Sequence, residues 1–88
     1  MTREKCLSLA RDAVMSARES EYGSPKDSMD RIARMWSAAF GHEFSARDVA
    51  LAMVLVKASR ISSGHGGDSW VDAAGYSAIG FEIDDGQV

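Results

Sequence analysis

The stretch SARDVALAMVLVKASR, residues 45–60, decides the fold class. Ser45 suits the position before a helix, and Asp48 stands three residues later, where the acid of a capping box belongs. The octet Val49–Val56 is apolar throughout and by itself fits either a buried strand or a buried helix. Because the cap before it and the KASR after it extend the pattern to helix length, we predict the central helix of a small bundle.

Two segments with helical periodicity precede this stretch. The first is expected from about residue 3 to residue 20, with apolar residues at spacings of three and four. These residues are Leu7, Ala10, Val14 and Ala17. The second has Ser24 as its N-cap, Pro25 as its first residue, Asp27 as its capping-box acid and Gly41 as its terminator. Its apolar stripe consists of Met29, Ile32, Ala33, Trp36 and Phe40.

A fourth helix follows the glycine-rich segment SGHGG, residues 63–67. It is expected to begin with Asp68 as its N-cap and to end near Ile83, with residues 84–88 as a frayed tail. Its buried residues are expected to be Val71, Ala74, Ala78 and Ile79. The sequence therefore predicts an all-α fold, a compact bundle of about four helices in antiparallel hairpins that forms one domain over residues 1–88.

The composition is that of an ordinary globular protein, with 45% apolar and 26% charged residues. A chain of 88 residues removes only about two thirds of its surface from water, so we expect a homodimer or larger oligomer. The net charge of −3 argues against a nucleic-acid partner. The single Cys6 excludes an intramolecular disulfide and fits a reducing compartment. Because no apolar run resembles a signal peptide or a membrane span, we expect a cytoplasmic protein with no membrane partner.

The predicted topology gathers charged residues at one end of the bundle. Because short connections make successive helices antiparallel neighbours, the first and third connections fall at the same end. The residues expected there are Tyr22, Gly23, Asp27, Lys57, Arg60, His65, Asp68 and Asp72. Two interpretations stay open: a structural set of caps and ion pairs, with Asp72 paired to Arg60, or a site for a polyanion and a metal ion.

The chemistry of these side chains suits either interpretation. Asp68 and Asp72, one helical turn apart, offer oxygen ligands of the kind that Mg²⁺ prefers, but an N-cap and an ion pair would use the same residues. Lys57 and Arg60 would neutralise phosphate oxygens, or would only complement the negative end of their own helix. His65 between glycines would reach a ligand or would simply be solvated.

A spaced combination of residues covers nearly the whole chain: Arg18-x-x-x-Tyr22-Gly23-x-Pro25, Ile32-Ala33-x-x-Trp36, Asp48-Val49, Lys57-x-x-Arg60 and Asp68-x-x-x-Asp72-x-x-Gly75-Tyr76. This combination resembles a family of small phage and prophage proteins that is known mainly as a domain of unknown function. The family is distantly similar to the all-α nucleoside triphosphate pyrophosphatases (MazG-like) and to a phage nucleotide-modification-associated domain. Those enzymes hold Mg²⁺ with an E-x-x-E and a later E-x-x-D and release NMP and pyrophosphate. Asp27-x-x-Asp30 is the nearest analogue of the first motif, and Asp72 is the counterpart of the later aspartate.

The resemblance implies a phage or prophage protein, in the host cytoplasm, that acts on or binds a nucleotide or a related phosphorylated small molecule. The residues expected to bind substrate are Arg18, Tyr22, Lys57, Arg60 and His65, and those expected to hold Mg²⁺ are Asp27, Asp68 and Asp72. No catalytic residue is assigned, and whether the protein is an enzyme stays open. The alternatives are a non-catalytic phage module that binds a nucleotide or a host protein, and a structural oligomer without a small-molecule site.

Overall fold

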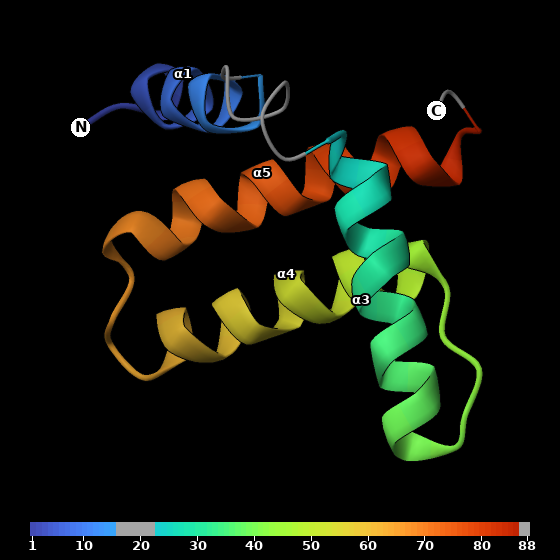
Figure 1. Ribbon diagram of the computed structural model, residues 1–88. Helices are drawn as coiled ribbons and strands as arrows, with labels where there is room; N and C mark the ends of the chain where they lie inside the picture. Colours follow the sequence, from blue (N-terminus) through green and yellow to red (C-terminus); the bar gives the residue numbers. More distant parts are fainter. Residues whose placement is uncertain (16–22, 87–88) are drawn as a thin grey trace.

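The computed structural model describes residues 1–15 and 23–86, which form four α-helices (Figure 1). The helices are α1 (Arg3–Val14), α3 (Pro25–Phe40), α4 (Ala46–Ser62) and α5 (Gly67–Asp84). The all-α prediction is confirmed. α1 ends at Val14 with Met15 as its C-cap, and the remainder of the first predicted helix, residues 16–20, lies outside the described residues. None of the described helices has the length and apolar character needed to cross a membrane.

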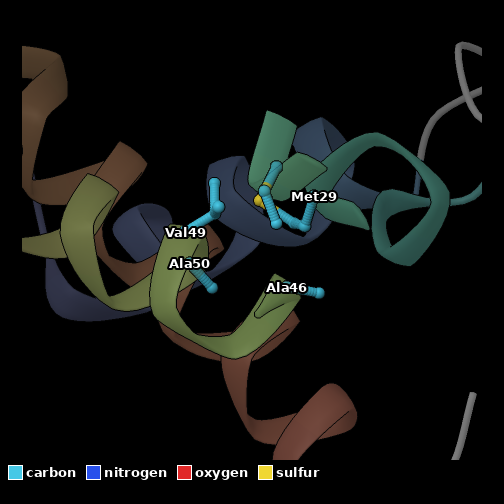
Figure 2. Close-up of a cluster of buried hydrophobic side chains, with 5 residues drawn as sticks. Met29, Ala46, Val49 and Ala50 are labelled. Carbon is cyan, nitrogen blue, oxygen red and sulfur yellow. The ribbon is translucent and has the colours of Figure 1, made fainter. Parts of the chain in front are cut away.

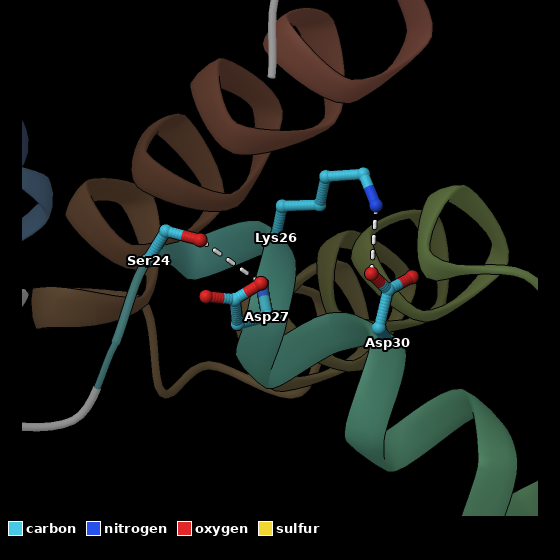
Figure 3. Close-up of polar contacts among 4 residues, drawn as sticks. All are labelled: Ser24, Lys26, Asp27 and Asp30. Atoms are coloured by element: carbon cyan, nitrogen blue, oxygen red, sulfur yellow. Dashed lines mark hydrogen bonds and ion pairs between the residues drawn. The ribbon is translucent and has the colours of Figure 1, made fainter.

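Both helix starts that were predicted from a serine are confirmed, but the described capping box forms at Ser45 and Asp48, whereas at Ser24 and Asp27 the contact is the serine cap alone. The Ser24 hydroxyl accepts the backbone N–H of Asp27 at 3.1 Å, and Pro25 occupies the first position of α3 (Figure 3). Ser45 and Asp48 form a reciprocal capping box, in which each side chain accepts the backbone N–H of the other residue. Two hydrogen bonds lower the pKa of the Asp48 carboxyl group. The larger effect on this pKa comes from the Ser45 backbone N–H, and the smaller one from the Ser45 hydroxyl.

The start of α5 differs from the prediction. Its N-cap is Gly66, and Asp68 lies inside the first turn. The reason is a tight backbone turn, in which the Ser69 N–H donates to the Gly66 carbonyl at 2.6 Å and begins the helix before Asp68. Asp68 therefore adds negative charge near the positive end of the helix dipole instead of capping it.

The helices do not all form antiparallel hairpins. α4 and α5 run antiparallel through the short connection at residues 63–66, α1 covers the opposite side of α5, and α3 crosses α4 steeply (Figure 1). The main contacts of α5 are with α4, α1 and α3, whereas those of α4 are with α5 and α3. The central helix is thus α5, and the prediction that residues 45–60 would be central is wrong because much of their apolar surface stays uncovered.

The core lies where α3 crosses α4 (Figure 2). The cluster of buried side chains consists of Met29, Ala33, Ala46, Val49 and Ala50. Val49 is fully buried, and Ile79 and Ile83 of α5 pack against the cluster. Met29 and Ala33 were predicted to be buried and are, whereas Phe40 on the same predicted stripe is exposed, because it stands at the far end of the crossing helix.

The predicted buried residues of α5 are only half covered. Val71, Ala74 and Ile79 are half-buried and Ala78 is exposed, while Ser69 and Gly75 are buried. A Cβ atom on Gly75 would lie 3.1 Å from Cγ1 of Val14. The absence of a side chain there lets α1 approach α5 closely. The buried face of α5 is therefore the face that carries the small residues Ser69 and Gly75.

Candidate functional site

The antiparallel packing of α4 on α5 brings predicted site residues together at the α4–α5 end. Lys57 Nζ lies 3.1 Å from a carboxylate oxygen of Asp72, with 19% of the lysine side chain and 42% of the aspartate side chain exposed. One turn further along α4, Arg60 donates from Nε to the Ser69 hydroxyl at 3.3 Å. The predicted pair Arg60–Asp72 is therefore wrong: three steps forward along α4 correspond to three steps back along α5, which places Arg60 opposite Ser69.

The connection between the helices is ordered by its own hydrogen bonds. The backbone N–H of His65 and the hydroxyl of Ser63 both donate to the Arg60 carbonyl, at 3.0 Å each. The Ser63 hydroxyl also lies 3.3 Å from Nδ1 of His65. His65 and Asp68 are exposed, so this end presents an imidazole and a carboxylate to solvent beside the Lys57–Asp72 pair.

Asp27 does not join this group. Pro25, two residues before it, lines a groove with Ala78 and Ile79, in the C-terminal half of α5. Ala78 is ten residues along α5 from Asp68, which corresponds to about 15 Å along the helix axis. The described residue Asp27 therefore does not share one end of the molecule with Asp68 as predicted, because α3 crosses α4 instead of lying antiparallel beside it.

The surroundings of Asp27 are accordingly local (Figure 3). Its backbone N–H binds the Ser24 cap, and its neighbour Lys26 pairs with Asp30 at 2.7 Å within the same helix. Gly23 precedes this helix start and is likewise separated from Asp68. The two remaining predicted substrate contacts, Arg18 and Tyr22, lie outside the described residues.

No group of three or more histidine, cysteine or carboxylate side chains within residues 1–15 and 23–86 is arranged to hold a metal ion. Asp68 and Asp72 remain one helical turn apart on α5, and Mg²⁺ can be held by one or two protein carboxylates when phosphate oxygens supply further ligands. The magnesium site therefore stays a prediction, now without Asp27 as a partner of the other two carboxylates.

Trp70 is a further candidate at this end of the molecule, and it is not among the predicted site residues. Its side chain is 60% exposed, and a Cβ atom on Gly66 would lie 3.1 Å from its Nε1 atom, so the indole lies against the α4–α5 connection. Helical geometry contains the signal that was missed. Trp70 directly follows the buried Ser69 and stands two positions from Asp72, which places it on another face of α5 from the residues that contact α4.

A separate groove of about 410 Å³ lies at the other end of α5. Its walls include Val14 of α1, Pro25 of α3, and Ala78, Ile79 and Phe81 of α5. The walls are mainly apolar, and among the described residues none that was predicted to bind substrate or metal lines the groove. The charged group and this groove are therefore distinct features of the molecule.

The all-α domain with this charged end can be placed in a family. Residues 5–84 match the family described as "Domain of unknown function (DUF6378)", and the chain belongs to it. It is 37% identical over 75 residues to "Gene 55 protein" of Mycobacterium phage L5, covering 83% of this chain and 48% of that protein. "Gene 55 protein" of Mycobacterium phage D29 is 35% identical over 75 residues, covering 84% of this chain and 50% of that protein.

This chain spans about half the length of these curated relatives. No solved structure matches it. The predicted resemblance to a phage-associated domain family of unknown function is confirmed. The more distant likeness to nucleoside triphosphate pyrophosphatases stays a prediction.

Proposed function

We propose that the α4–α5 end binds a nucleotide or a related phosphorylated small molecule together with a divalent cation. The observation that carries the proposal is the convergence of Lys57, Arg60 and Asp72 from two helices at a solvent-accessible end. His65 and Asp68 are part of the same end through the short connection. A balanced set of two cations and two carboxylates suits a metal–phosphate complex better than it suits a bare anion or a bare metal.

The roles of the side chains follow from their chemistry. Arg60 uses Nε for Ser69, and its planar guanidinium has further N–H donors that match phosphate oxygens. Lys57 adds a point charge, and Asp68 and Asp72 supply the carboxylate oxygens that Mg²⁺ prefers. Such an ion would support attack of water on a phosphoanhydride bond, which is the reaction that the family resemblance implies.

Trp70 adds a flat apolar surface at the same end of α5, against the connection that follows α4. Its exposed indole lies against Gly66, next to the start of α5. Stacking of a base on an exposed aromatic ring contributes about 1–3 kcal/mol to binding and tolerates any base. The proposal therefore assigns the phosphates to Lys57 and Arg60 and the base to Trp70.

Trp70 also provides a direct assay. The chain has two tryptophans, so the Trp36→Phe variant leaves Trp70 as the sole indole. We expect its fluorescence to change saturably when NTPs or dNTPs are added with Mg²⁺ or Mn²⁺. Arg60→Ala is expected to weaken the apparent affinity by about tenfold or more, because it removes a charged hydrogen-bond donor. Arg34→Ala, which removes an exposed arginine from α3, is the matched control and should leave binding unchanged.

Product analysis on the same samples distinguishes binding from turnover. Pyrophosphate and NMP that disappear in Asp72→Ala would support the enzymatic form of the proposal. Saturable binding without products would support a non-catalytic nucleotide module. The absence of both a fluorescence change and a product, with every nucleotide and metal tried, would contradict the proposal. That outcome would favour the second candidate, a module that acts through protein contacts. The exposed apolar residues of α4 support that candidate.

A further inference from the structure

The outward side of α4 carries a row of residues that we name the outer stripe: Leu51, Leu55, Ala58 and Ser62. Their spacings of four, three and four residues place them on one face of the helix. All four are exposed, and the exposed fractions of Leu51 and Leu55 are 49% and 61%. Val56, at the edge of the stripe, is 48% exposed. The face opposite the core is thus apolar over about two helical turns.

The charged residues of α4 are all engaged within the chain. Asp48 belongs to the capping box with Ser45, and Arg47 Nε lies 2.9 Å from an Asp84 carboxylate oxygen. Lys57 pairs with Asp72, and Arg60 donates to Ser69. These are the only charged positions between residues 46 and 62, so the outer stripe itself is neutral. A neutral apolar face selects an equally neutral apolar face and offers nothing to a charged partner.

The exposed area of the molecule is large for its size. A folded monomer of 9.5 kDa typically exposes about 5,000 Å², whereas this chain exposes 6276 Å². The excess is larger than the roughly 800 Å² that each partner buries in a standard protein interface. The buried apolar set of the described residues is also small, because it consists of Ala10, Met29, Ala33, Ala46, Val49 and Ala50. This excess belongs to the whole chain, and the exposed apolar side chains of α4, Leu51, Leu55 and Val56, are part of it.

We propose that the outer stripe pairs with the outer stripe of a second copy of this chain, with the two α4 helices antiparallel about a two-fold axis near Leu55. Such an interface is self-complementary, so the same residues serve both copies. With the axis at that position, Leu51 of one copy faces Ala58 of the second copy, and the large side chain packs on the small one. Leu55 lies beside Leu55 of the second copy at the centre, where interface residues contribute most. This pairing does not depend on a ligand at the α4–α5 end.

Sedimentation equilibrium over about 1–200 μM protein tests the pairing directly. The wild-type chain is expected to approach twice the 9.5 kDa mass of one chain. Leu55→Asp is expected to weaken association roughly 100-fold, because it places two carboxylates at the centre of the interface. Met35→Asp introduces the same charge on an exposed apolar position of α3 and should leave the mass unchanged. A monomer throughout this range, or dissociation by Met35→Asp and not by Leu55→Asp, would overturn the proposal.

Cysteine cross-linking keeps the proposal testable if Leu55→Asp disturbs the fold. A disulfide forms only when the two Cβ atoms come within about 3.5–4.5 Å. A cysteine near a two-fold axis can therefore form a disulfide with the same residue of the second copy. In the Cys6→Ser background, which removes the native thiol, Leu55→Cys is expected to give a covalent dimer on mild oxidation. Met35→Cys in the same background should run as a monomer on a non-reducing electrophoresis gel. Equal cross-linking of both variants, or of neither, would refute the antiparallel α4 pairing.

Discussion

The two connections that flank α4 differ in composition and in what they do to the chain. At the α3–α4 corner, the ring of Phe44 lies edge-on to Trp36, with 5.7 Å between centroids, and to His42, with 4.9 Å. The Phe44 backbone N–H also donates to the Ser37 hydroxyl at 2.9 Å. The α4–α5 connection instead consists of Ser63, His65 and two glycines, and the Ser63 hydroxyl and the His65 backbone N–H donate to the Arg60 carbonyl.

This difference explains the two helix-pair geometries. An aromatic residue that packs back on the preceding helix holds the corner open, so α3 crosses α4 and the core forms at the crossing. Gly64, with φ at +90°, lets the other connection reverse within a few residues, so α4 and α5 lie antiparallel and their side chains meet in register. The corner therefore supports stability, and the α4–α5 end gathers polar groups that are available for binding.

The largest effect is expected in the core beside the corner. Val49→Asp buries a carboxylate at a fully buried position without a partner, which should cost at least about 4 kcal/mol of unfolding free energy and prevent cooperative folding. Circular dichroism during thermal unfolding measures this. Met35→Asp, on the exposed side of α3, should cost less than about 0.5 kcal/mol. A cooperative transition close to wild type for Val49→Asp would show that the α3–α4 crossing does not form the core.

The next effect tests the aromatic corner. Trp36→Ala removes a half-buried ring from Phe44, and we expect a loss of about 2–3 kcal/mol of unfolding free energy from lost packing and ring contact. Chemical denaturation followed by circular dichroism measures the loss. Trp70→Ala is the matched comparison, since an exposed ring should contribute less than about 1 kcal/mol. The reverse order of the two variants would place the stabilising aromatic contact at the α4–α5 end.

A smaller effect is expected from the ion pair at the other end. Asp72→Asn removes the partner of Lys57, and because the aspartate side chain is 42% exposed, we expect a loss of only about 0.5 kcal/mol. A double-mutant cycle with Lys57→Met isolates the pair from other effects of either change. A coupling energy above about 2 kcal/mol would mean that the pair is a structural element, which would weaken the case for a binding role.

The smallest expected effect concerns pH and the start of α4. Hydrogen bonding to Ser45 lowers the pKa of Asp48 from its ordinary value of 3.8, so the ionised carboxylate stabilises the folded state. This contribution is present above pH 3.8 and is lost as the pH falls through the lowered pKa of the folded protein. The difference in stability between the wild type and Asp48→Asn should therefore shrink on acidification. A difference that stays constant down to low pH would show that ionisation of Asp48 contributes nothing.

Local sequence alone determined much of this protein. Two helix starts could be predicted from short motifs, Ser24 with Pro25 and Ser45 with Asp48, because capping depends on residues within one turn. The apolar run after Ser45, together with its cap, predicted α4, and the spaced pattern from Arg18 to Tyr76 indicated the family. These features involve neighbours in the sequence, or their order along it, and so can be predicted without knowing how the helices pack.

Only the tertiary structure decided which distant residues meet. The crossing of α3 over α4 separates Asp27 from Asp68. The register between α4 and α5 pairs Asp72 with Lys57 and places Arg60 against Ser69. The close approach of α1 at Gly75 set which face of α5 is buried and left Trp70 exposed. Crossing angle and register depend on how side chains from separate helices interlock, and helical periodicity within a single segment contains no information about that fit.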